Sequence, residues 1–186
     1  MAILRVEIVG SPVLRKKARA IRKADPSIAR LLDDMVETMD QAPGVGLAAP
    51  QVGQSVRVIV AHVEEDLYRL VNPRVVKRDG AVEGLEGCLS LPSLQGVVVR
   101  PERVEVKALS ERMRPMTIEA EGFIARVLCH EIDHLDGTLF IDRADPDSLH
   151  WIMKDEESED GLRREPTTLE EALESFEELR RERRAS

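Results

Sequence analysis

The segment His130-Glu131-Ile132-Asp133-His134 constrains this chain more than any other part of its sequence. Two histidines four residues apart share a face only in an α-helix, where both imidazoles can reach one ion. Glu131 follows the first histidine, so its carboxylate can approach the open side of a bound metal and take a proton from water. Because this pattern also arises by chance on surface helices, the argument for a metal site needs a third ligand.

Apolar spacing predicts two helices that bracket the centre of the chain. One runs from about Gly122 to Asp136, carries both histidines and has Gly137 at its C-terminal cap. The other opens at Asp25-Pro26, where Asp25 can cap it, and ends before Pro43-Gly44. A short third helix is predicted from Asp145-Pro146 through Met153, and a charged helix after Pro166.

The residues between the two long helices favour strands. Val- and Ile-rich or alternating segments occur at 56–60, 67–71, 75–76, 97–99, 104–109 and 115–119. Asn72-Pro73 indicates a turn, and Asp79-Gly80 predicts a hairpin between the segment ending at Val76 and Val82. Strands clustered between helices, without regular alternation, favour an α+β fold.

Length and charge exclude several classes of protein. A chain of 186 residues is long enough for one domain with a substantial core. Its net charge is −8, and residues 155–186 contribute 12 acidic and 6 basic residues. The rest is nearly balanced, so no basic face indicates DNA binding. The start of the chain does not resemble a signal peptide, and no window approaches the roughly 18 apolar residues of a membrane span, so we expect a cytoplasmic protein without membrane contact.

Four candidates for the third metal ligand or a nucleophile are His62, His150, Cys88 and Cys129. The two histidines are isolated and are more simply ordinary surface or core residues. Cys88 lies in Glu86-Gly87-Cys88-Leu89-Ser90, where the glycine lets the backbone approach a ligand closely. A small buried hydrophobe is the alternative role for this cysteine.

A compact loop, Gly44-Val45-Gly46-Leu47-Ala48-Ala49-Pro50-Gln51, follows the first helix. It lacks the Gly-Lys-Ser/Thr ending of a phosphate-binding loop. It is suited either to hydrogen-bond an extended peptide along its edge or simply to form a tightly packed turn, and Gln51 offers an amide donor.

These three segments, in this order, resemble the peptide deformylase family, whose pattern is a GxGLAAxQ loop, an EGCLS segment and an HExxH helix. Gly10-Ser11-Pro12-Val13-Leu14-Arg15 is also similar to the opening of that family, so the resemblance spans roughly residues 3–150. It implies an α+β fold with antiparallel sheets around a central helix, an N-terminal helix and a charged C-terminal helical tail. We expect residues 1–154 to form the catalytic domain and 155–186 an extension.

The resemblance also implies a role for each matching residue. Cys88, His130 and His134 would hold the metal, and Glu131 would act as general base and acid. The side chain of Gln51 and the backbone N–H of Leu89 would stabilise the oxyanion. The remaining matches would bind substrate: the main chain at Val45, Gly46 and Gly87, and the methionine side chain at Phe123 and Val127.

The implied reaction is hydrolysis of the N-formyl group from formyl-methionyl nascent peptides, which releases formate. The implied cofactor is one divalent metal per chain, Fe²⁺ as the native ion, with Zn²⁺, Ni²⁺ or Co²⁺ able to occupy the site. One thiolate and two imidazoles suit several of these metals. The basic end of the tail, Arg180-Arg181-Glu182-Arg183-Arg184, suggests a transient ribosome contact, which its acidic upstream part disfavours.

Two features depart from the family pattern or extend it. Cys129 stands where relatives usually carry glutamine, and since adjacent helical residues diverge by about 100°, we expect it to pack away from the metal. Arg100 is a candidate partner for Glu86. The alternative functions are an HExxH metallopeptidase, which would leave the Cys88 segment unexplained, and a catalytically silent relative that binds peptides or ribosomes.

Overall fold

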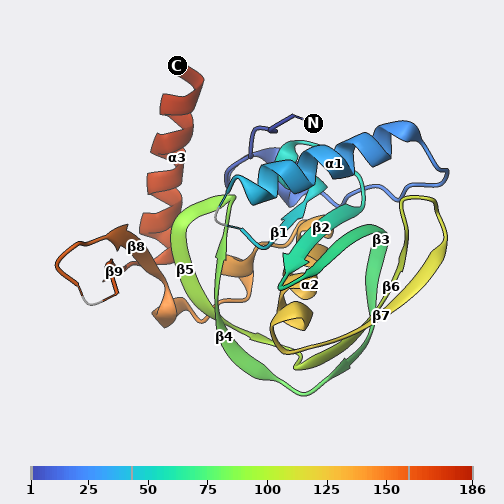
Figure 1. Ribbon diagram of the computed structural model, residues 1–186. Helices are drawn as coiled ribbons and strands as arrows, with labels where there is room; N and C mark the ends of the chain where they lie inside the picture. The colour runs from blue at the N-terminus through green and yellow to red at the C-terminus, as the bar shows by residue number, and fades with distance from the viewer. Residues whose placement is uncertain (1, 43, 159, 186) are drawn as a thin grey trace.

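A computed structural model describes residues 2–42, 44–158 and 160–185 of the chain. Two antiparallel sheets and three α-helices account for most of this length (Figure 1). The first sheet has the order β1-β2-β3-β6-β7 and the second β4-β5-β8-β9. The strands are β1 (Gly46–Ala48), β2 (Val58–Val63), β3 (Asp66–Asp79), β4 (Val82–Cys88), β5 (Leu91–Arg100), β6 (Arg103–Leu109), β7 (Pro115–Glu121), β8 (His150–Lys154) and β9 (Leu162–Pro166).

The helix α2 (Gly122–Leu135) lies inside the molecule, enclosed by strands (Figure 1). Its apolar residues, among them Leu128, Ile132 and Leu135, are buried against strands of the five-stranded sheet. Removing such side chains from water is the main favourable term that holds the helix in place. Gly137, with φ of +78°, ends this region as predicted, and a side chain there would collide with the backbone of Arg15.

The other two helices cover the outside. α1 (Pro26–Asp40) begins where predicted, with the Asp25 side chain accepting a hydrogen bond from the backbone N–H of Ser27. It packs Leu32, Met35 and Met39 against β1 and β2. α3 (Leu169–Ala185) stands beside the body with its C-terminal end directed away (Figure 1), and Ala172 and Phe176 anchor it in a second core.

Two predicted turns are wrong. The hairpin at Asp79-Gly80 does not form, because β3 pairs with β6 while β4 pairs with β5 in the other sheet. Gly80, with φ of +70°, instead carries the chain from one sheet to the other. Asn72-Pro73 lies within β3 at a register irregularity, and the Asn72 side chain bonds the backbone of Ile21.

The predicted third helix is also wrong. Pro146–Ser148 forms one 3₁₀ turn, and the residues from His150 onward form β8. The β-strand is favoured because Trp151 and Leu94 become directly opposite partners across β8 and β5. The helix ending near Asp40 is confirmed, while Pro43 lies outside the described residues. Within the described part of the chain, no helix is long and apolar enough to cross a membrane.

Candidate metal centre and active site

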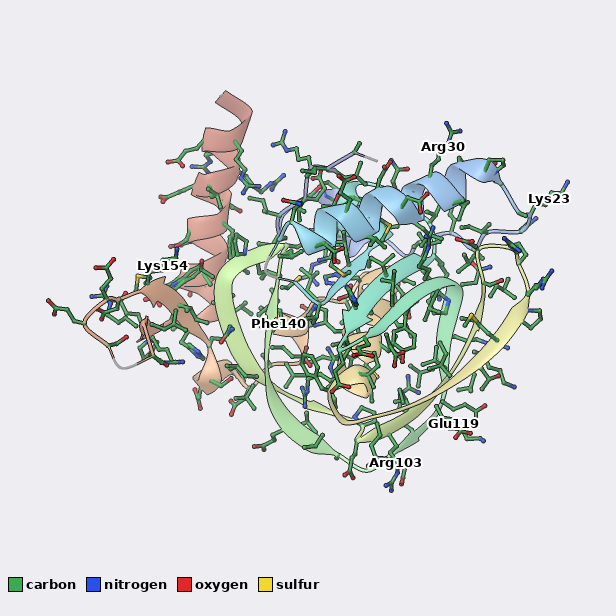
Figure 2. The ribbon with its side chains drawn as sticks, viewed as in Figure 1. Lys23, Arg30, Arg103, Glu119, Phe140 and Lys154 are labelled. Atoms are coloured by element: carbon green, nitrogen blue, oxygen red, sulfur yellow. The ribbon has the colours of Figure 1, made fainter. Side chains whose placement is uncertain are left out.

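The interior position of α2 buries the motif that it carries. The exposed fractions of His130, Glu131 and His134 are 9%, 4% and 1%. The two imidazole rings meet edge to face with centroids 5.0 Å apart, as the four-residue spacing predicts. Phe140, labelled in Figure 2, stacks on the His130 ring with the two ring centroids 6.3 Å apart, and so covers one face of the imidazole. The two histidines are therefore fixed side by side within the core.

Cys88 reaches these histidines from the end of β4. The pairing of β4 with β5 shifts register between Gly87 and Cys88, which turns the thiol toward α2. Its Sγ lies 3.2 Å from Nε2 of His134. One ligand atom from each of Cys88, His130 and His134 lies within 4.8 Å of the other two.

This donor set fits a transition metal. One sulfur and two imidazole nitrogens leave a fourth position open, the arrangement of a catalytic rather than a structural site. Burial lowers the pKa of His134 well below its ordinary value, so this ring is neutral, as a ligand must be. The other two histidines lie elsewhere: His62 faces Asp40, and His150 contacts the carbonyl oxygen of Ser148.

A buried network of charged side chains contacts His130 on the Nδ1 side of its ring. Glu86 Oε2 lies 2.9 Å from Nδ1 of His130, which leaves Nε2 for a metal. Arg100 contacts both carboxylate oxygens of Glu86 at 2.9 Å, as the sequence suggested. Burial alone would raise the pKa of Glu86, but hydrogen bonds from Arg100 and His130 outweigh it and lower the pKa to about 2. The carboxylate therefore stays ionised.

Two members of this network escaped the sequence analysis. Arg126, one turn before His130, donates to Glu86 at 2.8 Å and to the carbonyl oxygens of Val82 and Val98. Asp133 bonds Arg100 and, at 2.6 Å, Arg143. The available signal was a single arginine within the apolar run 123–129, since a buried cation requires partners.

Gln51 also turns toward the triad. Its Oε1 accepts a hydrogen bond from the backbone N–H of Ala48 at 2.7 Å, which fixes the orientation of the amide. Its Nε2 then points at Cys88 Sγ, 3.3 Å away. Leu89 lies in the turn directly after Cys88 and lines the same cleft. The 44–51 loop is therefore part of the site.

Glu131 lies on the open side of the triad. Burial raises its pKa to about 7. Among the described residues, no hydrogen-bond partner meets its Oε2. Its carboxyl group rests against the bare Cα of Gly46, where any side chain would overlap it. A buried carboxylate oxygen without a protein partner calls for one from outside the described protein groups, such as a water molecule.

These groups line one cleft of about 720 Å³. The sequence-predicted binding residues Val45, Gly46, Gly87, Phe123 and Val127 all line it, and Phe123 is 57% exposed at its mouth. Other lining side chains, chiefly Leu85, Gln95, Ile152, Lys154 and Leu162, were not predicted from the sequence, because none of them belongs to a motif.

Cys129 does not join the site. Its side chain is 6% exposed and packs in the core between α2 and the five-stranded sheet. The cysteine in place of the usual glutamine therefore lies outside the group of ligand atoms, as the 100° divergence of adjacent helical residues predicts.

Comparison with known proteins agrees with this geometry. The family model described as polypeptide deformylase matches residues 3–149. The peptide deformylase of Symbiobacterium thermophilum is 50% identical over 163 residues, 86% of this chain and 74% of that protein. That of Natranaerobius thermophilus is 50% identical over 160 residues, 85% of this chain and 99% of that protein.

Solved structures give the same result. The crystal structure of peptide deformylase from Thermotoga maritima has a TM-score of 0.77 and 40% identity, and covers 78% of this chain and 100% of that one. The enzyme from Thermus thermophilus has a TM-score of 0.74 and 49% identity, and covers 77% and 86%. The chain therefore belongs to the polypeptide deformylase family, the metal-dependent hydrolases that remove the N-formyl group from newly made proteins.

Proposed function

We propose that Cys88, His130 and His134 hold the catalytic metal and that Glu131 is the general base and acid of deformylation. The observation that carries this assignment is that ligand atoms of Cys88, His130 and His134 lie within 4.8 Å of one another, beside the cleft that Cys88, His130 and Glu131 line. A bound divalent cation would supply Lewis acidity and a water of lowered pKa.

Two observations support proton transfer by Glu131. Its unpartnered Oε2 can accept a proton from the attacking water and deliver it to the amine that leaves with the peptide. Its buried surroundings place its pKa near neutrality, where a carboxyl group can both accept and release a proton. Gly46 leaves the carboxyl group room beside the substrate chain.

Gln51 and the backbone N–H of Leu89 would stabilise the oxyanion that develops on the formyl oxygen. Support comes from the fixed orientation of the Gln51 amide and from the position of Leu89 beside Cys88. Preorganised donors need no rearrangement when negative charge develops, and loss of one typically costs about 10²- to 10³-fold in rate.

The cleft suits an extended formyl-methionyl chain. Gly87 and the Val45-Gly46 segment would hold its main chain, since Gly87 lies in β4, Gly46 begins β1 directly after Val45, and all three line the cleft. Phe123 and Val127, on successive turns of α2, would contact the methionine side chain. A formyl carbon bears only hydrogen, so a tight site can reject bulkier acyl groups.

Fe²⁺ is the proposed native metal, with Zn²⁺, Ni²⁺ or Co²⁺ able to replace it. The mixed thiolate and imidazole set is compatible with each of them. Metal analysis of protein purified without oxygen would test this proposal. We expect iron, and a loss of activity on exposure to air as iron and thiolate oxidise. Zinc at full occupancy, with air-stable activity, would contradict it.

The decisive assay is formate release from a formyl-Met peptide, measured anaerobically with ferrous iron. Glu131→Ala should abolish release while the protein stays folded, and Glu83→Ala, an exposed change on β4, should not. Cleavage of an unformylated peptide would instead support the metallopeptidase alternative. Absence of turnover at full metal occupancy would support a silent binding protein.

We also propose a division into a catalytic domain, 1–154, and an extension, 155–186, with a transient ribosome contact through α3 in the cytoplasm. Arg181 and Arg183 are exposed near the projecting end of α3, while Arg180 lies against Gly10. Co-sedimentation with ribosomes should fall in Arg181→Glu/Arg183→Glu if the contact exists. Unchanged sedimentation would overturn it.

A further inference from the structure

The hairpin of β8 and β9 forms a wall of the catalytic cleft. The match to the family model ends at residue 149, directly before β8 begins at His150. Ile152, Lys154 and Leu162 of this hairpin line the same cleft as Glu131 and Cys88. This wall therefore follows the part of the chain that defines the family, yet it faces the reaction site.

The two faces of the hairpin have different partners. Trp151 turns inward, where its ring packs on Phe176 of α3 at a centroid distance of 5.4 Å. Side chains alternate along a strand, so Ile152 and Lys154 point to the opposite face. Leu162 shares that face because it is the direct partner of Lys154. α3 thus holds one face of the hairpin, while the other is presented to the cleft.

The register of the sheet connects the cleft-facing side of the hairpin to β4, the strand proposed to bind the peptide. Gly87 of β4 is opposite Gln95 of β5, and Gln95 is opposite His150 of β8. Directly paired residues point to the same face of a sheet, so Gly87, Gln95 and His150 share one face. Ile152, two residues after His150 on β8, lies on that face as well. Leu85, two residues before Gly87 and 47% exposed, adds an apolar side chain to this face.

Ideal sheet geometry gives the distance that a peptide must span between Gly87 and Ile152. Two strand spacings and two residues along β8 place Ile152 roughly 12 Å from Gly87. A chain that leaves β4 at Gly87 and follows the cleft across β5 past Gln95, advancing about 3.4 Å per residue, covers this distance in three or four residues. A nascent chain whose first residues are held at Gly87 would bring its fourth or fifth residue over the hairpin.

We propose that Ile152 and Leu162 form an apolar subsite for the fourth or fifth residue of the formylated chain, with the stem of exposed Lys154 at its rim. The proposal rests on the peptide placement given under Proposed function. The occupant is substrate because the hairpin surface is continuous with the catalytic cleft. Its acidic residues lie in the 155–160 turn and at Glu165, which is paired with Trp151 on the face opposite the cleft.

The test compares two peptides, formyl-Met-Ala-Ser-Leu-Leu and formyl-Met-Ala-Ser-Ser-Ser, by formate release. Partial burial of one leucine side chain corresponds to about a fivefold gain in kcat/KM for the first peptide. Ile152→Ser/Leu162→Ser should bring the ratio of the two kcat/KM values close to one. Arg163→Ser, on the opposite face of the same hairpin, should keep the fivefold ratio.

Each outcome decides a separate question. A wild-type ratio near one, or a ratio that survives in the double variant, overturns the subsite while leaving deformylation intact. Failure of the wild-type protein to release formate from either peptide overturns the proposed catalytic assignment instead. Equal loss of the ratio in Arg163→Ser would assign the effect to hairpin stability and reject direct contact with substrate.

Discussion

Glu86 Oε2 lies 2.9 Å from Nδ1 of His130, so a carboxylate on β4 orients the imidazole on α2 that we propose as a metal ligand. This contact fixes which imidazole nitrogen faces the cleft and strengthens it as a ligand. The two residues are 44 positions apart, and the sheet and the central helix bring them together. The β4 segment thus carries one proposed ligand, Cys88, and orients a second, His130, through Glu86.

Glu86→Gln should weaken metal binding and activity by about 10- to 100-fold, the usual range when such an orienting contact is lost. The amide retains the size of the side chain but loses the charge that attracts Arg100 and polarises His130. Metal content at limiting metal concentration and kcat/KM should be measured together. Glu83→Gln, on the same strand but exposed, is the matched control. Wild-type metal affinity in Glu86→Gln would refute the orienting role.

Arg100→Ala should destabilise the protein by about 3 to 5 kcal/mol, because it leaves the buried charge of Glu86 short of a partner. The guanidinium is 4% exposed and joins Glu86 to Asp133. Urea unfolding of the metal-free protein isolates this effect from metal binding. Arg103→Ala removes an exposed arginine that pairs with Asp79 and should leave the free energy of unfolding close to the wild-type value. Equal effects of the two substitutions would show that the buried network contributes little.

The sequence predicted the α+β fold class and three motifs that the structure brings together, but several individual elements around them were wrong. HExxH, EGCLS and the glycine-rich loop each consist of local residues whose types are required by chemistry, so they could be placed without knowing the topology. The hairpin predicted at Asp79-Gly80 does not form. The same dipeptide can connect two paired strands of one sheet or lead the chain from one sheet to another. Only the partners of β3 and β4, which are β6 and β5, decide the outcome.

Two other gaps have similar physical origins. The 146–153 segment has apolar residues that fit a helix or a strand, and its pairing with β5 selects the strand. Arg126 and Asp133 act through partners that are distant in sequence, Glu86 and Arg100, so no local pattern marks them. Long-range contacts, which depend on the complete fold, account for what local reasoning missed.

The two cysteines should respond oppositely to substitution by serine. Cys88→Ser replaces a thiolate with a hydroxyl that is a poor ligand for a soft divalent metal, so bound metal should fall sharply. Cys129→Ser should retain its metal and lose about 1 to 2 kcal/mol of stability, because a hydroxyl is placed in an apolar core. Elemental analysis and thermal unfolding check both variants. A large loss of metal in Cys129→Ser would overturn the packing role.

Phe176→Ala should destabilise the protein by about 3 kcal/mol or more, although it lies on the charged C-terminal helix. Phe176 is 2% exposed and packs on Trp151, so its removal leaves a cavity beneath β8. Leu173→Ala, on the same helix but 37% exposed, should cost less than about 1 kcal/mol. Chemical denaturation measures both. If Phe176→Ala were as mild as its control, α3 would not be anchored through this ring.

Gly46→Ala should reduce kcat by at least about tenfold while leaving the fold and the metal in place. The added methyl group would occupy the space of the Glu131 carboxyl group, which must then move away from the attacking water. Gly46 is paired with Ala61 in regular β-structure, so alanine is acceptable to the backbone. The readouts are kcat, metal content and melting temperature on one preparation. A loss of kcat with the other two unchanged is expected, because only the proton carrier is displaced. A wild-type kcat would show that the Glu131 carboxyl group does not need the space beside the Gly46 Cα. It would contradict a catalytic role for the contact between these two residues.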